Sequence, residues 1–148
     1  MNILSSVERA LLLSIKPRYS QRIFSGDKTI ELRRTRPRIK PGEIILIYES
    51  SPTMAVIGAA YAKEIIVDSP SSLWELARIY ADVSHSEYRN YFSGSSKAVG
   101  IVVSKPWRFE KPTPLSILRS IWANFHPPQS FRYINKPQLL DLMSISIH

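Results

Sequence analysis

The sequence predicts an α+β fold, in which helices flank a small, bent β-barrel of five to six strands. Three observations favour this class. Short apolar runs recur between proline and glycine turns, and Ser-x-x-Glu pairs mark helix starts in the middle of the chain. Gly58 lies amid small and β-branched residues, which is typical of a bulged strand that bends a sheet. With 148 residues, no repeat and no linker, the chain is expected to form one domain over residues 1–148.

The first part of the chain predicts a strand, a helix and a second strand. The apolar run of residues 10–15 ends before a proline and indicates a buried strand. A helix follows over residues 17–25, because a proline opens it and Gly26 ends it. Residues 28–33 then alternate between apolar and polar side chains. This pattern predicts a strand with one core face and one polar face, the latter made by Thr29, Glu31 and Arg33.

The middle of the chain predicts two further strands and two helices. Residues 44–48 are apolar at every position, which indicates a central strand covered on both faces. Residues 55–67 follow a Ser-Ser-Pro turn and contain the glycine of the bent strand. Two capping boxes then predict helix starts, at Ser72 with Glu75 and at Ser84 with Glu87.

The last third predicts a strand, a helix and a final strand. Residues 98–103 form the strand, which is expected to end before residues 105–107, Lys-Pro-Trp. A Thr-Pro pair at residues 113–114 starts a helix with one apolar face. The proline-rich loop of residues 126–130 then leads into a last strand over residues 131–134.

Composition excludes several classes of site. The chain has no cysteine, which excludes disulfides, thiolate metal sites and a cysteine nucleophile. The three histidines are scattered, and neither a glycine-rich phosphate loop nor a dinucleotide fingerprint is present. We therefore expect no metal and no cofactor. The longest unbroken apolar run, residues 44–48, is far shorter than the roughly 18 residues of a membrane span, so a soluble cytoplasmic protein that does not bind membranes is predicted.

Positive charge is concentrated at one end of the chain. The formal net charge is +8, and residues 1–40 hold ten basic and three acidic side chains. Five of these cations fall within residues 33–40. A localised positive field attracts polyanions, nucleic acid above all, so this run predicts phosphate contacts. The alternative is a charged sheet edge that only prevents strand pairing.

The strand of residues 28–33 gathers chemically complementary groups. A turn places Lys28 at the rim of the strand, next to the hydroxyl, carboxylate and guanidinium of its polar face. Such a set can bind a phosphate and the edge of a base, and in a dry cleft Lys28 and Glu31 can shift each other's pKa. The alternatives are that Lys28 is a cation at a helix end and that Glu31 only pairs with a neighbouring cation. Tyr48, at a strand end, is either a core residue or a stacking platform for a base.

Five separately placed motifs carry a family resemblance: Ser14-Ile15-Lys16-Pro17-x-Tyr19, Ile23-x-x-Gly26-x-Lys28-Thr29-x-Glu31-x-Arg33, Pro41-Gly42, Tyr48-x-Ser50-Ser51-Pro52 and Gly58. In this order and spacing they resemble the ASCH domain of the PUA-like superfamily. Residues 127–133 also resemble the C-terminal segment of one prokaryotic branch of that family. The resemblance spans about residues 11–134.

This resemblance implies a PUA-like β-barrel with a basic cleft for RNA or nucleotides. Some bacterial members are metal-independent enzymes, which either deacetylate N4-acetylcytidine or cleave RNA. For the deacetylase the resemblance gives Lys28, whereas Glu31 stands where the family has threonine, and Glu75 is a loose candidate for a glutamate from the helices. For the ribonuclease it gives Tyr48 and Ser130, whereas a family lysine is replaced by Met54, so that Lys28 or Arg132 would have to supply the cation.

The leading hypothesis is an RNA- or nucleotide-binding module, with Lys28, Glu31, Tyr48 and Ser130 as catalytic candidates should the cleft be an active site. The alternatives are a metal-independent hydrolase that uses the same cleft and a protein-interaction module of a regulator. The predicted nucleic-acid-binding residues are Lys16, Lys28, Thr29, Glu31, Arg33, Arg34, Arg36, Arg38, Tyr48, Ser50, Ser51, Ser130 and Arg132.

Overall fold

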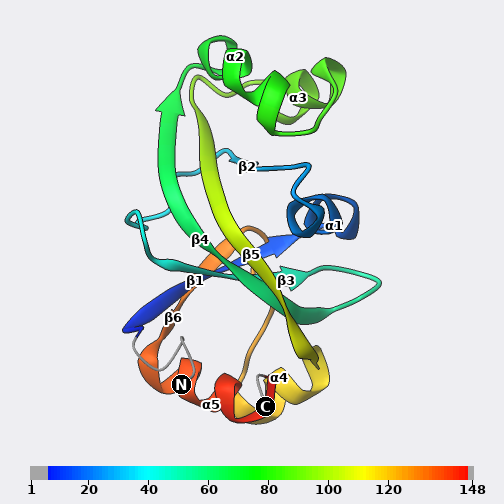
Figure 1. The fold of residues 1–148 in the computed structure, drawn as a ribbon, viewed down its shortest axis with the longest axis vertical. Coiled ribbons are helices and arrows are strands. Elements are labelled where there is room, and N and C mark those ends of the chain that lie inside the picture. Colours follow the sequence, from blue (N-terminus) through cyan, green and yellow to red (C-terminus); the bar gives the residue numbers. More distant parts are fainter. Residues whose placement is uncertain (1–6, 147–148) are drawn as a thin grey trace.

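A computed structural model describes residues 7–146, which form one six-stranded mixed sheet and five helices (Figure 1). The strand order is β2-β5-β4-β3-β1-β6; β1 and β3 are parallel, and the other neighbours are antiparallel. The strands are β1 (Arg9–Ile15), β2 (Ile30–Arg33), β3 (Ile44–Glu49), β4 (Ala55–Asp68), β5 (Ala98–Pro114) and β6 (Phe131–Asn135). The helices are α1 (Pro17–Ser25), α2 (Pro70–Tyr80), α3 (His85–Tyr91), α4 (Leu115–Ile121) and α5 (Lys136–Ser146).

The α+β class and the number of strands are confirmed, but the predicted barrel does not close. Strands β2 and β6 stand at opposite ends of the sheet order and share no backbone ladder. The chain that leaves β2 carries Pro37 and Pro41, which have no N–H to offer to a neighbouring strand. Side chains bridge the gap instead: Arg33 donates to the Ser130 carbonyl. The sheet is therefore bent and open, with its two edges joined by polar side chains.

The first helix forms over the predicted residues. Pro17 occupies the start of α1, where a missing N–H costs nothing, and Gly26 ends the helix in the left-handed conformation at φ 88°. The Gly26 N–H donates to the Ile23 carbonyl. This helix end directs the chain into the turn that carries Lys28.

Strand β5 is much longer than predicted, because a bulge absorbs its proline. Ala59 pairs with Trp107 and Tyr61 pairs with Ser104, so two residues of β5 oppose one residue of β4. Those two residues are Lys105, at φ 50°, and Pro106. The prediction that the strand ends before them is wrong. A bulged residue does not have to donate its N–H to the partner strand, so proline is tolerated there, and its neighbour can depart from the φ of a regular strand.

The long β4–β5 ribbon carries α2 and α3 at its tip (Figure 1). The capping box of Ser84 and Glu87 is confirmed at the start of α3. The box predicted at Ser72 is wrong, because α2 begins earlier, with Ser69 as its cap. The position of α3 is thus fixed by a reciprocal pair of side-chain to backbone hydrogen bonds.

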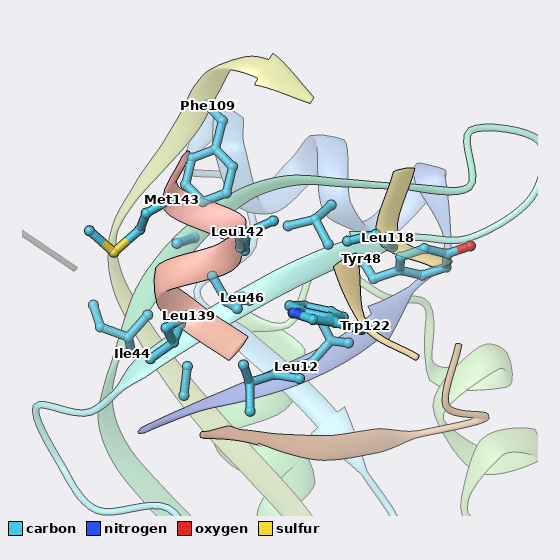
Figure 2. Packing of buried hydrophobic residues seen from close by; sticks show 14 of the residues in the cluster. Leu12, Ile44, Leu46, Tyr48, Phe109, Leu118, Trp122, Leu139, Leu142 and Met143 are labelled. Carbon is cyan, nitrogen blue, oxygen red and sulfur yellow. The ribbon is translucent and has the colours of Figure 1, made fainter. Parts of the chain in front are cut away.

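Two large apolar clusters cover the two faces of the central strands. On one face Leu46 and Tyr48 of β3 pack against Trp122, which follows α4, and against Leu139 of α5 (Figure 2). On the other face, Ile45 and Ile47 pack with α1. All six residues of β3 are buried, as predicted for a central strand. In the described part of the chain no helix is long and apolar enough to span a membrane.

Candidate functional site

A cleft of about 710 Å³ lies between α1, β2, α3 and the loop before β6. Its aromatic lining consists of Tyr19, Tyr88 and Tyr91. Its charged lining consists of Lys16, Lys28, Glu31, Arg33, Arg34 and Glu87. Hydroxyl groups come from Ser14, Thr35, Ser50 and Ser130. Four cations therefore face two carboxylates in one hollow, beside flat aromatic rings.

Lys28 lies buried on the wall of this cleft. Only 2% of the residue is exposed, and its Nζ donates to the Ala81 carbonyl at 2.5 Å. The same nitrogen lies 3.8 Å from Glu31 Oε1 and 5.2 Å from the centre of the Tyr19 ring. Burial lowers the pKa of Lys28, and the negative charge of Glu31 opposes that shift. The amine is thus held by one carbonyl, one carboxylate and one aromatic face.

Arg33 organises the opposite side of Glu31. Its Nη2 donates to Glu31 Oε2 at 2.7 Å and to the Ser14 carbonyl at 2.9 Å. Its Nη1 donates to the Ser130 carbonyl at 3.1 Å and to Ser130 Oγ at 3.3 Å. The Arg33 Nε is buried and has no hydrogen-bond partner among the residues that the structure describes. One guanidinium therefore joins β2, the end of β1 and the loop before β6.

The polar face predicted for β2 is therefore covered. Glu31 is 5% exposed and Arg33 is 6% exposed, and all four residues of the strand are buried. Alternation correctly separates the two faces, since Ile30 and Leu32 pack with α2 and α3. What covers the polar face is the loop before β6 together with α3, which are distant in sequence.

The outer wall of the cleft is a network between α1 and α3. Glu87 accepts hydrogen bonds from Arg18 and from the Tyr19 hydroxyl, the latter at 2.9 Å. Arg34 Nε donates to the Tyr91 carbonyl at 2.5 Å, and the guanidinium lies 5.3 Å from the centre of the Tyr91 ring. Tyr91 remains 39% exposed, so part of this ring is open to the cleft and to solvent.

Seven of the predicted binding residues line the cleft, and six lie elsewhere. Those in the lining are Lys16, Lys28, Glu31, Arg33, Arg34, Ser50 and Ser130. Those outside it are Thr29, Arg36, Arg38, Tyr48, Ser51 and Arg132. The loose candidate Glu75 is also outside, on α2, where its side chain is 73% exposed and pairs with Arg78.

Three of the outlying residues are held by contacts away from the cleft. Thr29 does not reach the cleft, because its backbone joins Tyr80 and Val103 and its side chain is not in the lining. The Tyr48 ring is 2% exposed inside the core cluster, so it packs as a core residue and offers no open face to a base (Figure 2). The Arg132 guanidinium lies 5.2 Å from the centre of the Phe125 ring and does not reach the cleft.

Sequence reasoning missed Glu87 and Tyr91 as cleft residues. No motif in the sequence singles out Tyr91. The capping box of α3 was the available signal, because a capped helix start fixes the direction in which Glu87 and the next turn point. The structure also brings no group of three or more His, Asp or Glu side chains together in a metal-binding arrangement within residues 7–146.

Comparison with known proteins assigns the family. The family model of the ASCH domain matches residues 13–113. The chain belongs to the ASCH domain family. A curated relative from Zymomonas mobilis, the "ASCH domain-containing ribonuclease", is 34% identical over 135 residues, which are 91% of this chain and 90% of the relative.

Solved structures agree with this assignment. The crystal structure of ASCH from Zymomonas mobilis superposes with a TM-score of 0.87 at 34% identity, covering 93% of this chain and 95% of that one. Structures of that protein with a tyrosine changed to phenylalanine and with a serine changed to alanine match with the same TM-score. Human THYN1, in complex with DNA containing 5-methylcytosine, has a TM-score of 0.61 at 13% identity over 93% and 96% of the two chains, and so shares the fold.

Proposed function

We propose that this ASCH domain binds RNA in the cleft between α1, β2, α3 and the loop before β6. The observation that carries the proposal is the Lys28–Glu31–Arg33 group on the wall of a cleft that Tyr91, 39% exposed, also lines. A single cleft thereby holds hydrogen-bond donors, an acceptor and an aromatic platform, which are the groups that recognise an unstacked base. The Zymomonas ribonuclease, which this chain matches over nine-tenths of both lengths, supports RNA as the polymer.

The two ends of the cleft take different parts of a nucleotide in this proposal. Arg34 and Lys16 are exposed and bind phosphate at the mouth. Glu31 accepts from a base N–H, and Lys28 and Arg33 orient that carboxylate. Tyr91, rather than the buried Tyr48, is the platform on which a base stacks.

Binding of labelled RNA, followed by fluorescence anisotropy at about 50 and 200 mM salt, tests the proposal. Affinity should fall with salt, and Tyr91→Ala should cost about 1–3 kcal/mol of binding free energy, as expected for one stacked base. Tyr80→Ala is the matched control, because Tyr80 is 47% exposed on α2 and does not line the cleft. No affinity for single-stranded or structured RNA, or equal losses in the two variants, would refute the proposal.

RNA cleavage without a metal is the second candidate function, and similarity to the Zymomonas ribonuclease over nine-tenths of both chains favours it. Ser130 Oγ already accepts a hydrogen bond from a cleft guanidinium, and the Tyr48 hydroxyl points out of the core cluster (Figure 2). Burial raises the pKa of Tyr48, and the positive charge of Arg119 opposes this shift. Arg119 adjoins Leu118 of α4, which packs in the same cluster as Tyr48, and it is the cation that this candidate reaction assigns to the phenol, since Met54 replaces the family lysine.

In this reaction the 2′-oxygen forms a bond to phosphorus while the bond from phosphorus to the 5′-oxygen breaks, so one group must take a proton and another must give one. Incubation of labelled RNA in EDTA tests the candidate. Cleavage should be lost in Ser130→Ala and in Tyr48→Phe and reduced in Arg119→Gln. It should rise in Met54→Lys, because an ammonium can neutralise the phosphorane and a thioether cannot. Cleavage that survives in both hydroxyl variants would rule these residues out.

A further inference from the structure

Residues 34–40, which we call the basic strap, lead from the cleft, which Arg34 and Thr35 line, to Tyr133 of β6. Arg34, Arg36, Arg38 and Lys40 are exposed, whereas Pro37 and Ile39 between them are buried. The strap contains no acidic residue. Alternate burial of this kind shows an extended chain with its apolar side turned inward and its cations turned outward.

The backbone of the strap is held in place. The Arg38 N–H donates to the Tyr133 hydroxyl of β6, and Arg9 donates to the Arg38 carbonyl. The Lys40 N–H donates to Glu43 Oε1 at 2.7 Å. Prolines at positions 37 and 41 also confine the residues before them to extended conformations. Little backbone entropy would therefore be lost when a ligand binds here.

The charged side chains of the strap beyond Arg34 take no part in these backbone contacts. Within residues 7–146, those of Arg36, Arg38 and Lys40 make no hydrogen bond or ion pair. The nearby carboxylates are engaged elsewhere: Glu43 binds Arg9 at 2.9 and 3.0 Å, and Glu8 binds Lys136 at 3.1 Å. The positive charge of the strap is thus directed at solvent and is not neutralised by its neighbours.

The spacing of the strap matches an extended polyanion. Exposed cations recur every second residue, or about 6–7 Å apart in an extended chain. That repeat can follow the successive phosphates of a single strand, and Tyr133 beside it is 37% exposed and carries a flat ring. Protection of a sheet edge from strand pairing does not by itself require four exposed charges of one sign.

We infer that the basic strap is a second RNA-binding surface, which takes the phosphates of the strand that leaves the cleft. Arg33 and Arg34 line the cleft, and the strap continues from them without a break, so one RNA strand can contact both surfaces. The inference rests on the proposed function of the cleft and adds an expected dependence on length. A trinucleotide occupies the cleft alone, whereas a longer single strand also reaches the strap.

The test compares a labelled trinucleotide with a labelled single-stranded RNA of about 12 nucleotides in anisotropy titrations at several salt concentrations. The triple variant Arg36→Gln, Arg38→Gln, Lys40→Gln should bind the longer RNA at least about tenfold more weakly and lower the slope of log K against log salt by about 2, at roughly 0.7 per phosphate contact. Its affinity for the trinucleotide should not change. The matched control is Lys63→Gln, Lys97→Gln, Lys111→Gln, which removes three exposed charges elsewhere and should alter neither affinity nor slope.

The outcomes separate this inference from the proposed function. If the wild type binds neither RNA, the proposed function of the cleft fails and the strap inference fails with it. If the wild type binds both RNAs and the strap variant behaves like the wild type, only the strap inference is overturned. Equal losses in the strap variant and in the matched control would show a general charge effect, which also overturns it. Loss of binding to phosphatidylserine vesicles with RNA binding intact would assign the strap to membranes instead.

Discussion

Replacing Arg33 by methionine tests whether one guanidinium holds the edges of the open sheet together. The side chain is 8% exposed and donates hydrogen bonds to Glu31, to the Ser14 carbonyl and to Ser130. Methionine keeps the length of the side chain but removes its charge and every donor. Glu31 would then be left as a buried carboxylate whose nearest cation, Lys28, is 3.8 Å away.

The magnitude follows from these contacts. Removing one partner of a buried ion pair costs about 3–5 kcal/mol, because the other charge stays buried without compensation. For a chain of this size, each kcal/mol lowers the melting temperature by about 2–4 °C, so the expected loss is roughly 6–20 °C. The double variant Arg33→Met, Glu31→Gln removes both charges and should be more stable than the single variant by about 1–2 kcal/mol.

Urea and thermal unfolding, followed by circular dichroism, measure both variants and the Glu31→Gln single variant. We expect the losses in unfolding free energy of the two single variants to be strongly non-additive, since the two residues share one hydrogen-bond network. A loss of less than about 1 kcal/mol in Arg33→Met would show that the guanidinium is not a structural link between the edges. Additive losses in the double variant would show that Glu31 does not depend on Arg33.

Three further predictions follow from other contacts. Ser84→Ala should cost about 1 kcal/mol of unfolding free energy and weaken RNA binding, because it uncaps the helix that carries Glu87; denaturation and anisotropy measure the two effects. Gly58→Ala should cost about 1–3 kcal/mol, because a Cβ there would overlap the Trp107 carbonyl; a lower melting temperature checks this. Burial raises the pKa of Tyr88 to about 12, so the unfolded chain releases this proton first and stability falls as pH rises from 10 to 12; in Tyr88→Phe that part of the fall should be absent from pH-dependent unfolding curves.

Local signals predict the elements whose ends depend on neighbouring residues. The helix of residues 17–25 is an example, because a proline at its start and a glycine at its end act within one turn. The missed helix α5 carried a signal of the same kind. Asn135 and Gln138 cap its start reciprocally, at 3.0 and 2.9 Å, in an Asn-x-x-Gln arrangement that resembles a capping box.

Features that depend on distant contacts were predicted less well. Alternation indicates that Glu31 and Arg33 share a face, but their burial comes from a loop about 100 residues later in the chain. The edges of the sheet were likewise expected to meet as a barrel. The sequence indicates the curvature, through the glycine of the bulged strand, but closure depends on whether the backbone groups of the two edge strands can pair. For the cleft, the sequence pattern predicted the charged residues of β2, whereas it did not indicate that Tyr91 of α3 lines the same cleft.

The place where α2 and α3 are inserted has a consequence for how this protein can diversify. Asp68 of β4 and Ala98 of β5 are paired, so the two helices occupy a position that a two-residue hairpin turn could fill. The two large cores contain no residue of either helix, whereas β2 packs against both helices through Ile30 and Leu32. The wall that carries Glu87 and Tyr91 therefore belongs to an insertion that can vary in sequence without changing either large core. Changes in this insertion would alter the α3 wall of the cleft, and changes near Ala81 would also alter the contact that holds Lys28.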